Sequence, residues 1–401
     1  MINITKMLSD FNSYGDKLRY HKSCKNNTHG VRENMGPVVV WNCTNKCNLK
    51  CKHCYSSSTV KEDKNTLSTT EGIKLINDLA EFKVPVLLFS GGEPLLRDDL
   101  FYLIKEATDK GIRVVISTNG TLLKEKTVNK LKKLKVSYVG VSIDGMEKTN
   151  DKFRGEKGAF QKALEGIRTC KKLSQKVGLR FTINQANYKE LDSVFQLVEN
   201  ENIPRICFYH LVYSGRGKNL QEFDLSSGEK KKVIDKIIYW AKRCIEKGNP
   251  KEILTVDNHT DGVYLYLKKL KEDPEQAQLI YDKLALSGGN RSGIAIASID
   301  NKGEVHPDQF TQNINLGNIR NRSFADIWTD SSCEILNKFR NRKKWIQGKC
   351  SRCKFMDICN GNLRARAYAV TGDMWAADPA CYLENEEIKK EKLMSDGGMK
   401  R

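Results

Sequence analysis

The sequence predicts an α/β fold built on a parallel sheet, followed by a small cysteine-rich domain. Two observations predict it. Residues 36 to about 213 alternate short apolar runs with amphipathic segments, and three cysteines cluster at 350–359 with Cys381 downstream. The 401 residues, of which 39% are hydrophobic and 29% charged, suit about two domains with a large core.

Six short runs between 36 and 213 predict strands, because they are apolar or β-branched and most end in Gly, Asn, Ser or Asp. They are PVVVW, VPVLLFSGG, IRVVISTNG, SYVGVSIDG, GLRFTIN and RICFYHLV. Amphipathic segments separate them; in STTEGIKLINDLAEF, Ser68 stands three residues before Glu71, a capping-box pattern. Alternating strands and helices form consecutive βα units, in which chemistry lies at the carboxyl ends of the strands.

The remaining segments are assigned by their pattern. Residues 1–35 form an amino-terminal extension and 36–223 the sheet domain. Residues 224–286 are highly charged with helical periodicity, so we expect a helical connecting segment. The cysteine-rich domain spans 287–390; after SGGNRSG it continues with IAIASIDNKGEVHPDQF, a hairpin pattern with its turn at residues 300–303. We expect the tail, 391–401, to fray.

Charge and hydropathy exclude some classes. The net charge is +19, but the lysines are spread over predicted helix surfaces without an aromatic-interleaved basic strip, which argues against nucleic-acid binding. No apolar run approaches the ~18 residues of a membrane span, and no secretory signal opens the chain. We therefore expect a cytoplasmic protein, whose clustered cysteines indicate metal or redox chemistry rather than disulfides.

The first cysteine group lies in CTNKCNLKCKHCYSSS, where Cys47, Cys51 and Cys54 have the spacing C-x3-C-x2-C. A zinc site closes with four ligands, which Cys43 or His53 would have to complete. An iron–sulfur cube with only three protein thiolates instead leaves one iron open to a substrate or cofactor. Most cubane sites supply four cysteines, so the triad favours an open cluster.

This triad follows the first predicted strand, precedes an aromatic residue (Tyr55), and resembles the radical S-adenosylmethionine (SAM) superfamily. In that superfamily the open iron binds the amino and carboxylate groups of SAM, which is cleaved to a 5′-deoxyadenosyl radical. The resemblance implies a partial (β/α)6 TIM-type barrel and a SAM-binding [4Fe–4S] cluster on the three cysteines. Cys43 has no role in the pattern, so we interpret it as a buried thiol.

Further motifs at the predicted strand ends match the same superfamily. In SGGEP the glycines permit close backbone approach, and the glutamate pairs with the SAM ammonium group. STNG, SIDG, KFRG and FTIN follow in order. By resemblance, the residues of these motifs that contact SAM are Gly91, Gly92, Glu93, Ser117, Asn119, Ser142, Asp144, Arg154 and Asn184.

The second cysteine group has four members with the spacing C-x2-C-x5-C-x21-C: Cys350, Cys353, Cys359 and Cys381. Four thiolates make a closed site, either zinc or a fully ligated cluster, and spacing alone does not choose between them. The group resembles the SPASM and twitch extensions of radical SAM enzymes, which implies an auxiliary [4Fe–4S] cluster. A full SPASM extension has seven cysteines; here VHPDQF, with His306 and Asp308, stands where the first is expected.

Longer phrases resemble the tetrapyrrole-modifying branch of the superfamily: HLVYSGRG, GEVHPDQF, LGNIRNRSFADIW and CNGNLRARAYAVTGDMWAADPACYL. The resemblance implies radical removal of the two acetate side chains of 12,18-didecarboxysirohaem, giving iron-coproporphyrin III, with reduced flavodoxin or ferredoxin as electron donor.

Three alternatives remain. One is a haem d1 biosynthesis enzyme acting on the same tetrapyrrole. Another is a peptide-modifying SPASM enzyme, although the segment before the first strand is short for a peptide-recognition domain. The third is a basic nucleic-acid-binding protein with structural zinc, which does not explain SGGEP.

Substrate contacts are predicted from side-chain chemistry. A tetrapyrrole with several carboxylates needs convergent arginines, and Arg216, Arg364 and Arg366 are candidates. His210 and His306 are candidates for hydrogen bonds to the tetrapyrrole or for axial ligation of its iron. A structural role is the alternative for each arginine.

Overall fold

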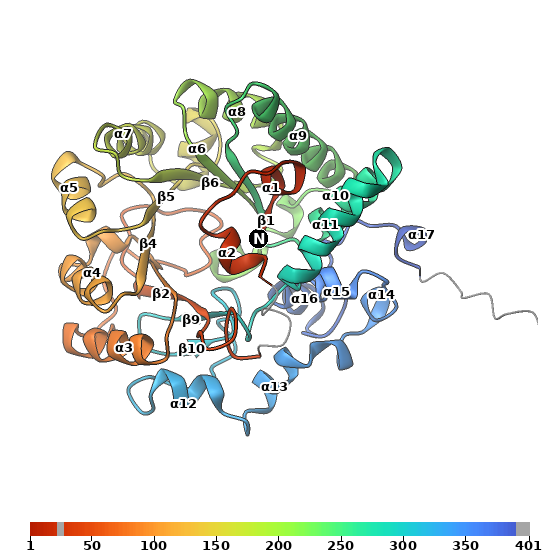
Figure 1. Cartoon of the computed structure of the whole chain (residues 1–401). Coiled ribbons are helices and arrows are strands. Elements are labelled where there is room, and N and C mark those ends of the chain that lie inside the picture. The colour runs from red at the N-terminus through yellow and green to blue at the C-terminus, as the bar shows by residue number, and fades with distance from the viewer. Residues whose placement is uncertain (22–27, 390–401) are drawn as a thin grey trace, which may run out of the picture.

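One curved sheet of ten strands organises the molecule, and most of its helices lie on the outside (Figure 1). The computed structural model of the protein describes residues 1–21 and 28–389. The tail predicted for 391–401 lies outside the described residues. The order of strands is β1-β8-β7-β6-β5-β4-β3-β2-β9-β10, so the neighbours from β2 to β8 follow the chain order.

All six predicted strands are present as adjacent parallel strands, which confirms the partial barrel. They are β2 (Val38–Thr44), β3 (Val86–Gly91), β4 (Arg113–Thr118), β5 (Tyr138–Ser142), β6 (Val177–Ile183) and β7 (Arg205–His210). The helices between them are α3 (Thr69–Glu81), α4 (Leu100–Asp109), α5 (Glu125–Lys133), α6 (Glu147–Arg154), α7 (Ala159–Lys172) and α8 (Leu191–Asn200). Parallel pairing brings all carboxyl ends of these strands to one rim.

Helix α3 shows how local sequence fixes an element. Ser68 accepts a hydrogen bond from the backbone of Glu71, and the Glu71 carboxylate accepts one from the backbone of Ser68, so the predicted capping box is confirmed. The buried face of the helix carries Leu75, Ile76 and Leu79. This face packs into the core that separates the sheet from its outer helices.

The segment predicted to be a helical connection, 224–286, also contains a strand that its charged, helical pattern did not predict. Helix α9 (Ser227–Glu246) is followed by β8 (Glu252–Val256), then by α10 (Thr260–Glu272) and α11 (Pro274–Ser287). β8 pairs in parallel with β7 and extends the sheet by one strand. On its other side it pairs antiparallel with β1 (Ile2–Asn3), which precedes α1 (Ile4–Leu8) and α2 (Asp16–Arg19).

The predicted hairpin is confirmed as β9 (Ile296–Ile299) and β10 (Val305–His306). Its turn contains Gly303 at φ +86°, a conformation that favours glycine. β9 also pairs in parallel with β2, so the hairpin extends the barrel sheet itself.

Short helices carry the cysteine-rich region. They are α12 (Phe324–Thr329), α13 (Glu334–Arg340), α14 (Gly348–Ser351), α15 (Met356–Cys359), α16 (Arg364–Thr371) and α17 (Asn385–Ile388). Among them, α15 packs against α10 and α11, and α12 packs against α3 (Figure 1). Within the described residues, no helix has the length and apolar content needed to cross a membrane.

Candidate active site

The loop after β2 brings three thiols to the carboxyl rim of the barrel. Cys47, Cys51 and Cys54 line one cavity of about 150 Å³ together with residues from the ends of β3 to β7. Cys43 does not join them. It is fully buried in the core, burial raises its thiol pKa to about 12, and its Sγ donates to the Ser90 carbonyl. This agrees with the interpretation of Cys43 as a buried thiol.

Donors point at the three sulfurs. The Leu49 N–H lies 3.4 Å from Cys47 Sγ, and the Arg154 guanidinium 3.6 Å from Cys51 Sγ. Burial would raise the pKa of Cys54, but hydrogen bonds from neighbouring serine hydroxyls hold it below its usual value. Burial raises the pKa of Cys47 to about 11. The hydrogen bond from the Leu49 backbone acts against burial, and the nearby negative charges act with it. Three converging sulfurs with N–H and O–H donors fit an iron–sulfur cluster with an open position.

The glycines of SGGEP have no room for a side chain. Gly91 has φ +122°, and a Cβ there would lie 2.2 Å from the Thr44 carbonyl oxygen. A Cβ on Gly92 would lie 2.1 Å from the Lys46 carbonyl oxygen. The motif therefore presses the end of β3 against the cysteine loop, and both glycines line the cavity.

Glu93 is fully buried next to this contact. Its carboxylate accepts hydrogen bonds from Thr118 Oγ1 at 2.7 Å, the Asn119 N–H at 2.8 Å and the Leu95 N–H at 3.1 Å. Burial raises its pKa to about 7 despite these donors. A buried carboxylate with this pKa gains from a cation, which suits the ammonium group of SAM.

Arg154 and Asp144 form a buried ion pair of 2.5 Å beside the cysteines. Asp144 also accepts from the Thr182 N–H at 2.7 Å, so it fixes the arginine over Cys51. His53, which the sequence analysis considered only as a zinc ligand, lies 3.4 Å from Asp144 and stacks on Phe153. Its position inside the cysteine motif was the available signal.

The other predicted SAM contacts divide into two groups. Ser117, Asn119 and Ser142 line the cavity. Asn184 does not: its side chain donates to the Thr182 carbonyl and accepts from the Ala186 N–H, so it closes the turn after β6.

The four cysteines of the second group come together around α14 and α15. Burial raises the pKa of Cys359 well above its ordinary value, and the nearby Cys381, Cys350 and Cys353 raise it further. The Phe355 N–H donates to Cys353 Sγ at 3.4 Å. Gly289 (φ +66°) packs against Cys359, where a Cβ would lie 2.3 Å from the backbone. Four gathered thiols fit a closed metal site.

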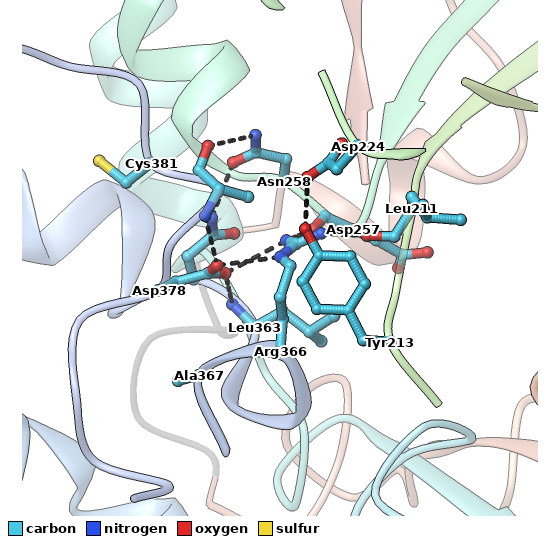
Figure 2. Close-up of polar contacts among 12 residues, drawn as sticks. Leu211, Tyr213, Asp224, Asp257, Asn258, Leu363, Arg366, Ala367, Asp378 and Cys381 are labelled. Carbon is cyan, nitrogen blue, oxygen red and sulfur yellow. Dashed lines mark hydrogen bonds and ion pairs between the residues drawn. The ribbon is translucent and has the colours of Figure 1, made fainter. Parts of the chain in front are cut away.

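Arg366 and Arg364, predicted to bind substrate, are instead buried structural residues. Figure 2 shows Arg366 between Asp378 and the carbonyls of Leu211 and Asp257, which follow β7 and β8. Arg364 donates to backbone carbonyls of its own domain, among them those of residues 361, 374 and 376. Both are fully buried, their terminal guanidinium nitrogens donate to protein acceptors, and neither lines the cavity at the cysteine triad.

Arg216, also predicted to bind substrate, contacts the cysteine loop. It donates to the carbonyls of Cys51 and Ser58, and its own N–H donates to the Cys54 carbonyl at 2.9 Å. Gly215 (φ +57°) lies against the same loop, where a Cβ would be 2.2 Å from the Tyr55 carbonyl oxygen. The SGRG phrase therefore holds the cysteine loop in place.

The two candidate histidines differ. His210 lines the cavity, and its Nε2 lies 2.9 Å from Asp261. His306 lies on β10 outside that cavity, where its Nδ1 is 2.6 Å from the Ile314 carbonyl oxygen. Of these two histidines, only His210 lines the cavity at the cysteine triad.

Comparisons with known proteins agree with this geometry. Residues 41–198 match the radical SAM superfamily, and residues 293–354 match SPASM, an iron–sulfur cluster-binding domain. In a solved structure of Streptococcus suis SuiB bound to precursor peptide SuiA, the same fold recurs with a TM-score of 0.69 at 17% identity. The match covers 87% of this chain and 76% of that one.

The chain belongs to the radical SAM superfamily and carries a SPASM domain. Over 394 residues it is 51% identical to Fe-coproporphyrin III synthase of Methanosarcina barkeri, covering 97% of this chain and 99% of the relative. It is 40% identical to pre-heme d1 synthase of Dinoroseobacter shibae, covering 93% and 92%. The resemblance drawn from the sequence motifs is confirmed.

Proposed function

We propose that the protein is an Fe-coproporphyrin III synthase, which removes the two acetate side chains of 12,18-didecarboxysirohaem. The observation that carries the proposal is the 51% identity over nearly the full length of both chains. That match spans both cysteine groups and the strand-end motifs between them. The cavity at the cysteine triad supports a radical SAM reaction on a bound substrate.

In this proposal Cys47, Cys51 and Cys54 hold a [4Fe–4S] cluster. With SAM bound, such a cluster would supply radical chemistry at a substrate side chain. Glu93 would neutralise the SAM ammonium group, and Arg154, held by Asp144, would pair with its carboxylate. The glycine contacts of SGGEP shape the backbone around that amino-acid portion.

Cys350, Cys353, Cys359 and Cys381 hold a second [4Fe–4S] cluster in this proposal. Four protein thiolates leave it no open iron, so we assign it to electron transfer rather than to SAM binding. Reduced flavodoxin or ferredoxin is the proposed donor, and the net charge of +19 favours such acidic partners. Both clusters require reduced thiols, in keeping with a cytoplasmic enzyme.

We also propose the domain division that follows from these roles. Residues 36–223 form the SAM-binding core, 224–286 the connecting segment that adds β8, and 287–390 the auxiliary-cluster domain. Residues 1–35 supply β1, which pairs with β8 at one end of the sheet.

The test is turnover by the anaerobically reconstituted, reduced protein with SAM and 12,18-didecarboxysirohaem. Mass spectrometry that records loss of two acetate side chains, with 5′-deoxyadenosine formed, supports the proposal. Formation of 5′-deoxyadenosine without change in this tetrapyrrole contradicts it. The 40% identity to a pre-heme d1 synthase then makes the haem d1 branch the next candidate, and peptides the third.

A further inference from the structure

A second cavity of about 350 Å³ lies inside the barrel and adjoins the one at the cysteine triad. The two cavities share lining residues from β2, β3, β6 and β7 and from the segments after β8 and β10. These are Val40, Leu88, Arg180, Tyr209, Asp257, Gln309 and Phe310. The barrel interior is therefore one continuous space that leads away from the cysteine triad.

Arg180 stands at the junction of the two cavities. It lies on β6, and its guanidinium is 4.9 Å from the centre of the Tyr209 ring. Within 1–21 and 28–389 its side chain has neither a hydrogen bond nor an ion-pair partner. This distinguishes it from Arg154, which pairs with Asp144, and from Arg366, which pairs with Asp378. Arg180 is partly buried, and a cation that faces a cavity without an acceptor gains from a ligand that supplies one.

The neighbouring strand is shaped around this side chain. Gly140 lies in β5, and a Cβ there would be 2.8 Å from Cδ of Arg180. In β6, a Cβ on Gly178 would lie 2.4 Å from the Tyr138 hydroxyl. Glycine inside a strand weakens it, so these positions indicate that space in the barrel interior is kept for the longer side chains.

The charge of the second cavity suits an acidic ligand. Its lining carries five arginines and two aspartates, and much of the rest is valine, leucine and isoleucine. Arg19 and Arg205 both pair with Glu252, whereas Arg113 stacks on Tyr14 at 3.7 Å and has no carboxylate partner among the described residues. Asp308 uses one oxygen to accept from Thr311. Apolar walls with a surplus of guanidinium groups match a ring system that bears carboxylates.

We propose that Arg180 binds a side-chain carboxylate of the tetrapyrrole at the junction of the two cavities. The inference rests on the proposed function and adds the residue that selects acidic tetrapyrroles. A guanidinium binds a carboxylate through two parallel hydrogen bonds, which fixes both position and orientation. Because Arg180 also lines the cavity of the cysteine triad, this contact orients the macrocycle relative to the radical source.

The test compares an acidic ligand with its neutral ester. Fe-coproporphyrin III and its methyl ester are titrated against the holoenzyme, with binding followed by the visible absorbance of the tetrapyrrole. We expect Arg180→Met to weaken binding of the acid by about tenfold or more, the factor for one charged hydrogen-bonded contact. Binding of the ester stays the same in wild type and variant. Arg168→Met, which removes an exposed arginine paired with Glu201, is the matched control and changes neither.

Each result is decisive. Equal affinity of wild type and Arg180→Met for the acid overturns the role of Arg180 and leaves the proposed function intact. A wild type that binds neither tetrapyrrole contradicts both. Should Arg180→Met fail to fold by circular dichroism, Arg180→Lys and the preference of the wild type for acid over ester replace it. A wild type that binds ester and acid equally would then overturn the inference.

Discussion

The two cysteine groups of this chain differ in the number of thiolates that they supply and in what surrounds them. The first offers three sulfurs at the wall of a cavity, beside an ion pair and a buried glutamate. The second gathers four sulfurs behind a fully buried Arg366–Asp378 pair. The difference teaches that the surroundings follow the number of thiolates: the three-cysteine group lines a cavity and has charged side chains beside it, whereas the four-cysteine group lies next to an ion pair whose partners are taken up by the protein.

The largest effect is expected when one cysteine is removed from each group. Cys51→Ala abolishes SAM cleavage, because two thiolates do not hold the cluster. Cys359→Ala leaves some SAM cleavage but stops productive turnover, because only the auxiliary cluster is lost. Chromatography of 5′-deoxyadenosine and mass spectrometry of the tetrapyrrole measure the two activities. Full turnover by Cys359→Ala would show that the reaction does not need the auxiliary cluster. Cys43→Ala is the control, because that thiol lies in the core and the variant retains every cysteine proposed to hold a cluster.

The next effect tests the enclosure of the second group. Asp378→Asn leaves Arg366 buried without its counter-charge, so we expect a loss of about 3–5 kcal/mol in unfolding free energy. Denaturant titration under anaerobic conditions measures it. Asp109→Asn breaks the exposed pair with Lys105, which solvent screens, so the unfolding free energy should hardly change. Similar losses in the two variants would show that the buried pair is not a structural anchor.

A smaller effect is expected at the buried glutamate of the first group. Its pKa of about 7 means that the carboxylate is present above this pH and protonated below it. SAM affinity should therefore fall as the pH drops below 7, because protonation removes the partner of the ammonium group. Glu93→Gln should weaken SAM binding about tenfold, the equivalent of roughly 1.4 kcal/mol, and flatten this pH dependence. Equilibrium dialysis with labelled SAM between pH 6 and pH 8 measures both, and an unchanged pH profile in the variant would point to another group.

The smallest effect is expected at Arg216, which holds the cysteine loop in place. Arg216→Lys keeps the charge but not the forked contacts with the Cys51 and Ser58 carbonyls, so we expect a loss of about 1 kcal/mol in stability. The KM for the tetrapyrrole should not change. Thermal unfolding and steady-state kinetics separate the two readouts. A raised KM with unaltered stability would restore Arg216 as a substrate ligand.

The sequence was informative where the chemistry is local. The strands of the barrel have apolar runs, and both cysteine groups have short spacings, so each could be predicted. Strand β8 could not, because EILTV is short and lies between lysine-rich helices whose pattern dominates the segment. Its partner β1 is only two residues long.

Side-chain roles were harder to predict than elements. Arg216, Arg364 and Arg366 stand in phrases typical of the family, but residue type does not reveal which acceptors the guanidinium meets. In the fold those acceptors are mostly backbone carbonyls. Arg180 was overlooked because it stands inside a strand run, although a charge flanked by apolar neighbours in a buried parallel strand is itself an anomaly.

The Arg366–Asp378 ion pair has a consequence for how the protein is synthesised. The Arg366 guanidinium donates to the carbonyls that follow β7 and β8, and Leu363 from the same segment lines the second cavity. Translation delivers residues 363–378 after every strand of the sheet has emerged. The contacts between this segment and the carboxyl ends of β7 and β8 therefore form only after every strand of the sheet has been synthesised. The cysteine loop at 47–54 leaves the ribosome long before this segment, so the chain of the first site is complete before its closing contacts can form.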